Sequence, residues 1–170
     1  MATVSYGLKI TEAYHIFDKT IKIYRNAVHY ISDIAIRHFD ELKSLESITG
    51  DDGKVIISAQ QRRQQKMERL IHSTANNDAV YKRFDKEFYK FPSYLRRDAI
   101  NTSIGLILSY RSQLQNWENR GKHGCRPYLN RNQNIMPCFY RNNTFLDSEE
   151  TNIVSLKLYN GKDWIWETFV

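Results

Sequence analysis

Apolar residues recur at intervals that change along the chain, and these intervals predict a strand, a run of helices and then more strands. Residues 3–10 alternate weakly between apolar and polar side chains, which is typical of a strand. Thr11 follows as a candidate N-cap. From Phe17 to Leu42 apolar residues then recur every three or four positions, as on one face of a long amphipathic helix. Gly50-Asp51-Asp52-Gly53 predicts the turn after it.

Three further helices are predicted in the middle of the chain. Ser58, followed three residues later by Gln61, forms a capping-box pattern that begins a helix over residues 58–75. A shorter helix over 78–89 ends before Pro92. The most regular helix begins at Ser93 and continues to about residue 117, with apolar residues along one stripe.

The pattern then changes to loop and strands. Residues 118–137 are rich in Asn, Arg, Gly and Pro and predict a loop. Strands are expected at 137–140 and 144–146, and a hairpin over 153–169 turns at Asn160-Gly161. The apolar positions of the hairpin predict one buried face, made of Val154, Leu156, Leu158, Trp164 and Trp166.

This order of elements predicts an α+β fold. The N-terminal strand joins the C-terminal strands in a small antiparallel sheet or barrel, and a lobe of three to four helices is inserted between them. The expected units are a β-domain formed by residues 1–10 and 120–170, and a helical lobe over residues 11–119.

Positive charge is concentrated in the middle of the chain. Residues 61–135 carry 15 basic and 6 acidic side chains, whereas residues 1–60 carry 7 basic and 8 acidic ones. Such a concentration favours a polyanion-binding face over a general solubility device, although a solvated helix surface remains the alternative. No apolar run is long enough for a membrane span. Two cysteines and the absence of a secretory signal favour a cytoplasmic protein.

The sequence offers little that would support catalysis. Its paired acids, Asp51-Asp52 and Glu149-Glu150, stand in polar turn contexts, and no acids are placed to share Mg²⁺. His123, Cys125 and Cys138 supply three potential zinc ligands without an evident fourth. No Gly-rich loop follows a strand. We therefore expect no catalytic site, no metal and no cofactor within these residues.

Basic side chains cluster at three places. Arg62, Arg63 and Lys66 share a helical turn without an acid among them. Arg96 and Arg97 stand at a helix start, where backbone N–H groups also favour phosphate. A predicted loop then carries several cations beside asparagines and a tyrosine, as a strand-tracking segment would; these cations include Lys122, Arg126 and Arg131. An ordinary helix surface and a plain surface loop explain the same patterns.

Several short motifs follow one another along the second half of the chain; they include Phe91-Pro92-Ser93-Tyr94-Leu95-Arg96-Arg97-Asp98-Ala99-Ile100-Asn101, Ser109-Tyr110-Arg111-Ser112, Phe139-Tyr140-Arg141-Asn142-Asn143 and the hairpin around Asn160-Gly161. Their order resembles that of TnpB-type (OrfB) proteins of insertion sequences, relatives of type V CRISPR effectors. The likeness covers residues 90–169 well and 3–45 more loosely. The opening strand lacks the proline that often follows it in that family.

The resemblance implies a wedge-type β-barrel with a helical recognition lobe, which holds guide RNA and target DNA and reads a short motif beside the target. It nominates nucleic-acid-binding residues on the helix (Arg96, Arg97, Asn101, Arg111) and near the following strand (Tyr140, Arg141, Asn142, Asn143). The match stops before the nuclease domain of that family, so a C-terminal nuclease domain is expected to be missing. Two alternatives stay open: a fragment of an active RNA-guided endonuclease, and a helical protein-interaction or regulatory module.

Overall fold

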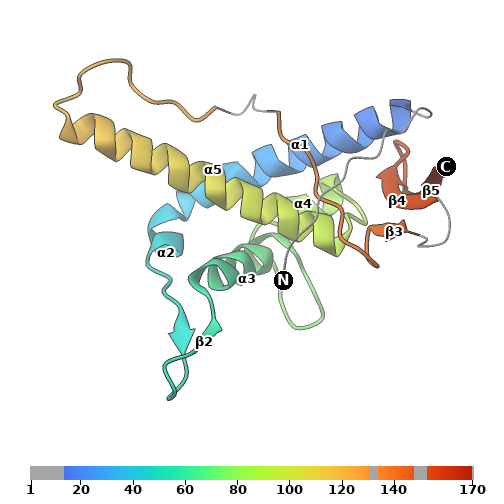
Figure 1. The fold of residues 1–170 in the computed structure, drawn as a ribbon, viewed down its shortest axis with the longest axis horizontal. Helices are drawn as coiled ribbons and strands as arrows, with labels where there is room; N and C mark the ends of the chain where they lie inside the picture. The colour runs from blue at the N-terminus through green and yellow to red at the C-terminus, as the bar shows by residue number, and fades with distance from the viewer. Residues whose placement is uncertain (1–13, 131–133, 148–152, 170) are drawn as a thin grey trace.

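The computed structural model describes residues 14–130, 134–147 and 153–169 and confirms an α+β fold (Figure 1). The predicted strand over 3–10, and its pairing with the C-terminal strands, lies outside the described residues. In chain order the elements are α1 (Tyr14–Arg37), α2 (Phe39–Lys43), β1 (Ile48–Thr49), β2 (Val55–Ile57), α3 (Ala59–Ile71), α4 (Arg83–Glu87), α5 (Ser93–Asn119), β3 (Phe145–Asp147), β4 (Val154–Tyr159) and β5 (Trp164–Phe169).

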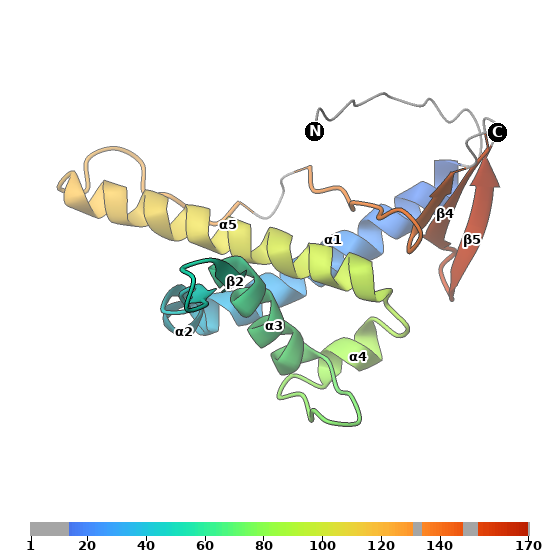
Figure 2. The ribbon, with the colours of Figure 1, turned by 60° about the horizontal axis from the view of Figure 1, so that its bottom comes forward.

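The core of the helical lobe lies between α1 and α5, which pack side by side and run in the same direction (Figures 1 and 2). Tyr24 of α1 contacts Asp98 early in α5, and Phe39 just after α1 contacts Arg111 late in α5. Apolar side chains at helical spacing fill the interface and exclude water, which is the main stabilising contribution to such a core. They include Val28, Ile31, Leu95, Ala99, Ile100 and Ile107.

The first helix is shorter than its apolar pattern predicts. α1 ends at Arg37, and α2 begins after His38, whose φ of −102° and ψ of 18° depart from helical geometry. Nε2 of His38 lies 2.9 Å from the Tyr81 hydroxyl, and its Nδ1 lies 3.2 Å from the Glu41 carboxylate. Because these partners come from a distant loop and from the next turn, tertiary contacts fix the break at His38.

The capping box predicted at the start of α3 is confirmed. The Ser58 hydroxyl accepts a hydrogen bond from the Gln61 backbone N–H, and the Gln61 side chain accepts one from the Ser58 N–H. α3 ends at Ile71 instead of residue 75, since His72 turns to extended geometry. α4 spans only Arg83–Glu87 within the helix predicted over 78–89.

The C-terminal strands form an antiparallel sheet in the order β3-β4-β5, and among the described residues it does not close into a barrel. The predicted hairpin is confirmed, with loop residues 160–163 between the strands. Gly161 has a φ of +105°, which favours glycine, and the Asn160 side chain accepts hydrogen bonds from the N–H groups of Lys162 and Asp163.

The predicted buried face of this hairpin was wrong for its tryptophans. Lys157 pairs with Trp166 and Tyr159 with Trp164, so both indoles lie on the face opposite Leu156 and Leu158. Trp166 is 42% exposed. Trp164 is buried on that opposite face because it packs against the Phe91 ring, with the centroids 5.1 Å apart.

The sheet docks on the first turns of α1. Leu156, Leu158 and Phe169 form a small second core, and Phe17 of α1 packs against Phe169 with the ring centroids 5.2 Å apart. The buried hydroxyl of Thr20 donates to the Ile16 carbonyl and accepts from the Tyr159 N–H at 2.8 Å. The hydrogen bond from the Tyr159 N–H fixes the position of β4 along α1.

Residues 134–140 extend across the helices without forming the strand predicted at 137–140. Their backbone polar groups bond to helical side chains: Arg25 donates to the Ile135 carbonyl at 2.8 Å, and Asp98 accepts from the Cys138 N–H at 3.0 Å. Pro137 also lacks the N–H that a strand would need. None of the described helices is long and apolar enough to cross a bilayer.

Candidate nucleic-acid interface

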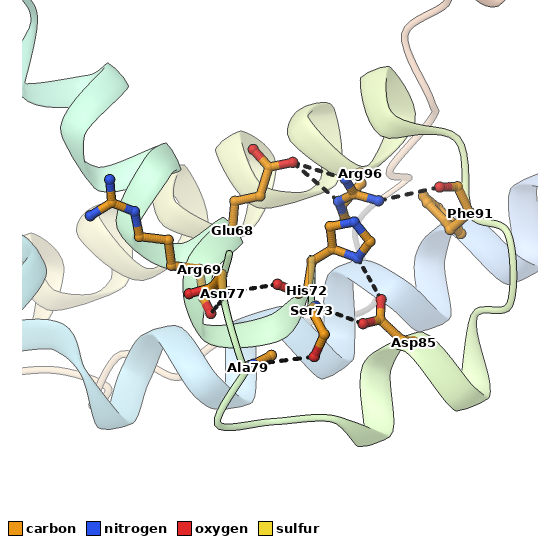
Figure 3. Close-up of polar contacts among 9 residues, drawn as sticks. All are labelled: Glu68, Arg69, His72, Ser73, Asn77, Ala79, Asp85, Phe91 and Arg96. Carbon is orange, nitrogen blue, oxygen red and sulfur yellow. Dashed lines mark hydrogen bonds and ion pairs between the residues drawn. The ribbon is translucent and has the colours of Figure 1, made fainter. Parts of the chain in front are cut away.

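Glu68 on α3 contacts both of the arginines at the start of α5, Arg96 and Arg97, that the sequence nominated for nucleic-acid binding. Nη2 of Arg96 lies 2.9 Å from Oε1 of Glu68 on α3, and another nitrogen of Arg96 bonds to the Phe91 carbonyl at 3.5 Å (Figure 3). Arg96 is only 7% exposed. It therefore joins α3 to α5, and its guanidinium is not presented outward.

Arg97, the next residue, occupies the outer side of the same junction. Its Nε lies 3.5 Å from Oε2 of Glu68, and its side chain remains 47% exposed. The guanidinium carbon lies 5.5 Å from the centroid of the Tyr94 ring, within cation–π range. The outer edge of this guanidinium can meet a ligand while Glu68 and Tyr94 hold its inner side.

The structure brings the start of α5 next to the segment around Tyr140. The Tyr94 and Tyr140 rings pack with their centroids 5.6 Å apart, and Tyr140 is 40% exposed. Partial burial, with the nearby Asp98 and Cys138, raises the pKa of Tyr140 above its usual value. Its phenol is therefore a neutral hydrogen-bond donor at physiological pH. Arg97, Tyr94 and Tyr140 thus form a continuous cation–aromatic row.

An open cleft of about 610 Å³ lies beside this row, between the end of α3, the following loop and the start of α5. Three arginines and one glutamate are among its lining residues, so the net formal charge around the cleft is positive. Arg69 is exposed there, and its side chain makes no hydrogen bond or ion pair to any described residue. The lining residues are Glu68, Arg69, His72, Thr74, Asn76, Asn77, Arg96 and Arg97.

Polar contacts hold the loop that borders this cleft (Figure 3). Nδ1 of His72 lies 2.7 Å from Oδ1 of Asp85, whose other oxygen accepts from the Ser73 N–H at 2.9 Å. The Asn77 amide donates to the carbonyls of Arg69 and His72, which end α3 without helical partners. The cleft wall is therefore anchored by α4 and by its own asparagine.

The pair Asn142-Asn143 forms a turn. Asn142 has a φ of +63°, a left-handed conformation that asparagine tolerates better than most residues. The Asn143 amide donates to the Arg141 carbonyl at 3.1 Å, and the buried Thr144 hydroxyl accepts from the Tyr140 N–H at 2.8 Å. The side chains of Arg141, Asn142 and Asn143 are exposed, within three positions of Tyr140 in the sequence.

The basic turn of α3 faces α2. Arg63 donates to the carbonyls of Leu42 and Leu45, and Arg62 donates to the Glu46 carbonyl at 2.8 Å. Lys66 forms an ion pair with Glu41, and that bond lowers the pKa of the Glu41 carboxyl. Arg63 thus caps the Leu42 carbonyl in the last turn of α2, and Arg62 bonds to the segment after that helix. These cations remain partly exposed, so a phosphate would have to share them.

The remaining predicted residues lie elsewhere along α5 or beyond it. Asn101 has a buried amide oxygen without a hydrogen-bond partner among the described residues. Arg111 lies over the Phe39 ring at 4.7 Å. Lys122 is exposed after the end of α5, and Arg126 lies 6.0 Å from the Trp117 ring. Arg131 falls outside the described residues.

Comparison with protein-family models gives one result: the model of the Aq_aa04 family matches residues 2–160. The chain belongs to the Aq_aa04 family. Searches of curated proteins and of solved structures gave no match. In the described part of this Aq_aa04 chain, no group of three or more His, Cys, Asp or Glu side chains could hold a metal ion.

Sequence reasoning missed the buried network that aligns this interface in the Aq_aa04 chain. The Tyr24 hydroxyl donates to Oδ2 of Asp98 at 2.5 Å, and the same oxygen accepts the Cys138 N–H. Burial and the Asp98 carboxylate raise the pKa of Tyr24 well above its usual value. One carboxylate thus ties α1 and α5 to the segment that carries Tyr140. An acid within an otherwise apolar stripe of α5 was the available signal.

Proposed function

We propose that this domain is a nucleic-acid-binding module that contacts its ligand through the cleft and the cation–aromatic row at the start of α5. In its fuller form, suggested by the TnpB-type resemblance, the module belongs to an RNA-guided DNA nuclease. It holds guide RNA and target DNA in the cytoplasm and reads a short adjacent motif, without cleaving either strand itself.

The observation that carries the proposal is the convergence of Arg97, Tyr94 and Tyr140 beside a cationic cleft. Arg97 and Tyr94 lie three positions apart in α5, and Tyr140, which follows Arg97 by 43 positions, adds the second aromatic ring to this row. Guanidinium groups bind phosphate oxygens, and aromatic rings stack on unpaired bases. The combination is typical of proteins that bind nucleic acid.

Internal contacts position this row, which favours binding. Glu68 fixes Arg96 and the inner side of Arg97, while Asp98 fixes the backbone at Cys138, two residues before Tyr140. Because the exposed groups are already positioned, less side-chain entropy is lost when a ligand binds.

A salt titration tests the proposal. Binding of a labelled DNA duplex and of an RNA hairpin to the purified chain is measured by fluorescence anisotropy between 50 and 200 mM salt. Each phosphate contact that is lost lowers the logarithmic salt slope by about 0.9 for duplex DNA. We expect a steep fall in affinity with salt, and no Mg²⁺-dependent cleavage. An affinity that does not change with salt would refute nucleic-acid binding.

One observation favours a second candidate, a protein-interaction module. The β1–β2 hairpin exposes Ile48, Val55 and Ile56 to 42%, 58% and 66%. Exposed apolar side chains on a two-stranded ribbon with free edges suit pairing with another polypeptide. Replacing Val55 and Ile56 with threonine separates the two candidates. Under our proposal the variant binds nucleic acid as tightly as the wild type. If nucleic-acid binding requires a protein contact through the hairpin, the affinity of the variant for nucleic acid falls.

A further inference from the structure

A second potential site lies late in α5, at Arg111. Four arginines among the described residues are half-buried: Arg25, Arg62, Arg63 and Arg111. The first three each donate to backbone carbonyls. Arg111 makes no hydrogen bond or ion pair to any described residue, and its Nε is buried without a partner. Leaving a buried charged donor unpaired costs more than leaving a neutral one, so this arrangement calls for an acceptor.

Arg111 lines an open pocket of about 390 Å³ between α2 and α5. The guanidinium carbon lies 4.7 Å from the centroid of the Phe39 ring. An aromatic contact covers a face of the guanidinium and leaves its edge donors for a planar or tetrahedral anion. The other polar residues of the pocket are Lys43, Ser112, Gln115 and Glu118.

The charges of the pocket favour an anion. Lys43 is exposed at the end of α2 and has no ion pair among the described residues, so it adds a second cation. Glu118 is the one acid lining the pocket, and it forms no ion pair with Arg111. Ser112 and Gln115 can donate further hydrogen bonds.

We infer that Arg111 and Lys43 bind a phosphate group in this pocket. That the phosphate belongs to a nucleic-acid backbone rests on the proposed function. Arg111 follows Arg97 by 14 residues, which is roughly 21 Å and close to four turns of helix. The two residues therefore lie on nearly the same side of α5, at a spacing of about six base pairs of duplex at 3.4 Å each.

NMR of the arginine side chains tests the inference directly. The Nε–Hε signal of Arg111 in ¹⁵N-labelled protein is assigned by its loss in Arg111→Lys. Inorganic phosphate, sodium acetate and a 10-base-pair DNA duplex are then titrated separately into the wild-type protein. We expect phosphate and the duplex to shift the Arg111 signal saturably, and the signals of Arg25, Arg62 and Arg63 to stay in place.

Variants sharpen the result. Lys43→Gln should weaken phosphate binding about threefold or more, and Glu118→Gln should strengthen it about two- to threefold, as expected for one charge near a partly exposed site. Lys22→Gln, which removes an exposed lysine on α1 that has no partner among the described residues, should leave it unchanged. Equal effects of Lys43→Gln and Lys22→Gln would refute the pocket.

The outcomes separate this inference from the proposed function. If the duplex binds but the Arg111 signal does not move with duplex or phosphate, the pocket is wrong and the proposed function stands. If phosphate shifts the signal and no nucleic acid binds, the pocket stands and the proposed function is wrong. If acetate shifts the signal as strongly as phosphate, the pocket is a carboxylate site for a protein partner and the phosphate assignment is overturned.

Discussion

The arginines at the two ends of α5 have different contacts. At the start, Arg96 is buried against Glu68, and Arg97 shares the same carboxylate from outside. Fourteen residues later, Arg111 contacts an aromatic ring and no described acid. A buried guanidinium with an internal acid mainly joins helices, whereas a guanidinium that is half exposed or has no acid is available to a ligand. The positive charge in the middle of the chain therefore overstates the charge that a nucleic acid meets.

The largest expected effect comes from removing the acid that aligns the first end. Asp98→Ala leaves the Cys138 N–H without its acceptor and the buried Tyr24 hydroxyl with only the Thr102 hydroxyl, 3.3 Å away. We expect the free energy of unfolding to fall by about 3–5 kcal/mol, as for other broken buried networks. Urea denaturation measures it, with Asp18→Ala on the exposed side of α1 as the control. A loss below about 1 kcal/mol would show that Asp98 does not hold the three segments together.

A smaller effect distinguishes the arginines directly. Arg96→Ala removes the ion pair with Glu68 and the contact with the Phe91 carbonyl, and should lower stability by about 2–3 kcal/mol. Arg97→Ala and Arg111→Ala remove no buried hydrogen bond and should each cost less than about 1 kcal/mol. Equal losses of unfolding free energy for the three variants, measured by thermal or urea unfolding, would show that Arg96 does not differ from Arg97 and Arg111 in its contribution to stability.

The raised pKa of Tyr24, near the start of α5, predicts how the stability of the protein depends on pH. This pKa is raised in the folded protein, so the unfolded chain releases this proton first as the pH rises. The stabilisation is complete below the unfolded pKa of about 10 and is lost progressively above it. Tyr24→Phe should cost about 1 kcal/mol at neutral pH and reduce the loss of stability between about pH 9.5 and 11. An unchanged alkaline slope in Tyr24→Phe would contradict the buried Tyr24–Asp98 pair.

The smallest stability change separates two roles of Asn142. Because its φ is +63°, Asn142→Gly keeps the turn and should change stability by only a few tenths of a kcal/mol. The same variant removes the amide that would pair with adenine, a contact worth about 1–3 kcal/mol of discrimination. Under the proposed RNA-guided function, a lost preference between matched and scrambled motif duplexes, measured with guide RNA bound, would support base reading. An unchanged preference would leave Asn142 with the turn alone.

Local features of the sequence predicted much of the fold. Ser58 and Gln61 are three residues apart and close their own capping box, and Asn160-Gly161 sets the hairpin. Contacts between distant residues escaped prediction. The Arg96–Glu68 ion pair spans 28 residues, and Trp164 is buried by Phe91, a residue from another element. The grouping of Arg96, Arg97, Tyr140 and the Asn142-Asn143 turn came from a family resemblance, because no local pattern relates residues so far apart.

The most direct test of the central claim measures nucleic-acid affinity after changes in the cation–aromatic row. Wild type, Arg97→Ala, Tyr140→Ala and the matched control Arg83→Ala are titrated with the same labelled single-stranded and duplex DNA. Arg83 is an exposed arginine paired with Glu87 on α4, so its removal changes net charge equally. We predict about tenfold weaker binding for Arg97→Ala to both ligands and, for Tyr140→Ala, a loss of about tenfold mainly on single strands, where stacking contributes about 1–3 kcal/mol per base. Arg83→Ala should change affinity less than about threefold. Equal losses for Arg83→Ala and Arg97→Ala would contradict a binding face at the start of α5.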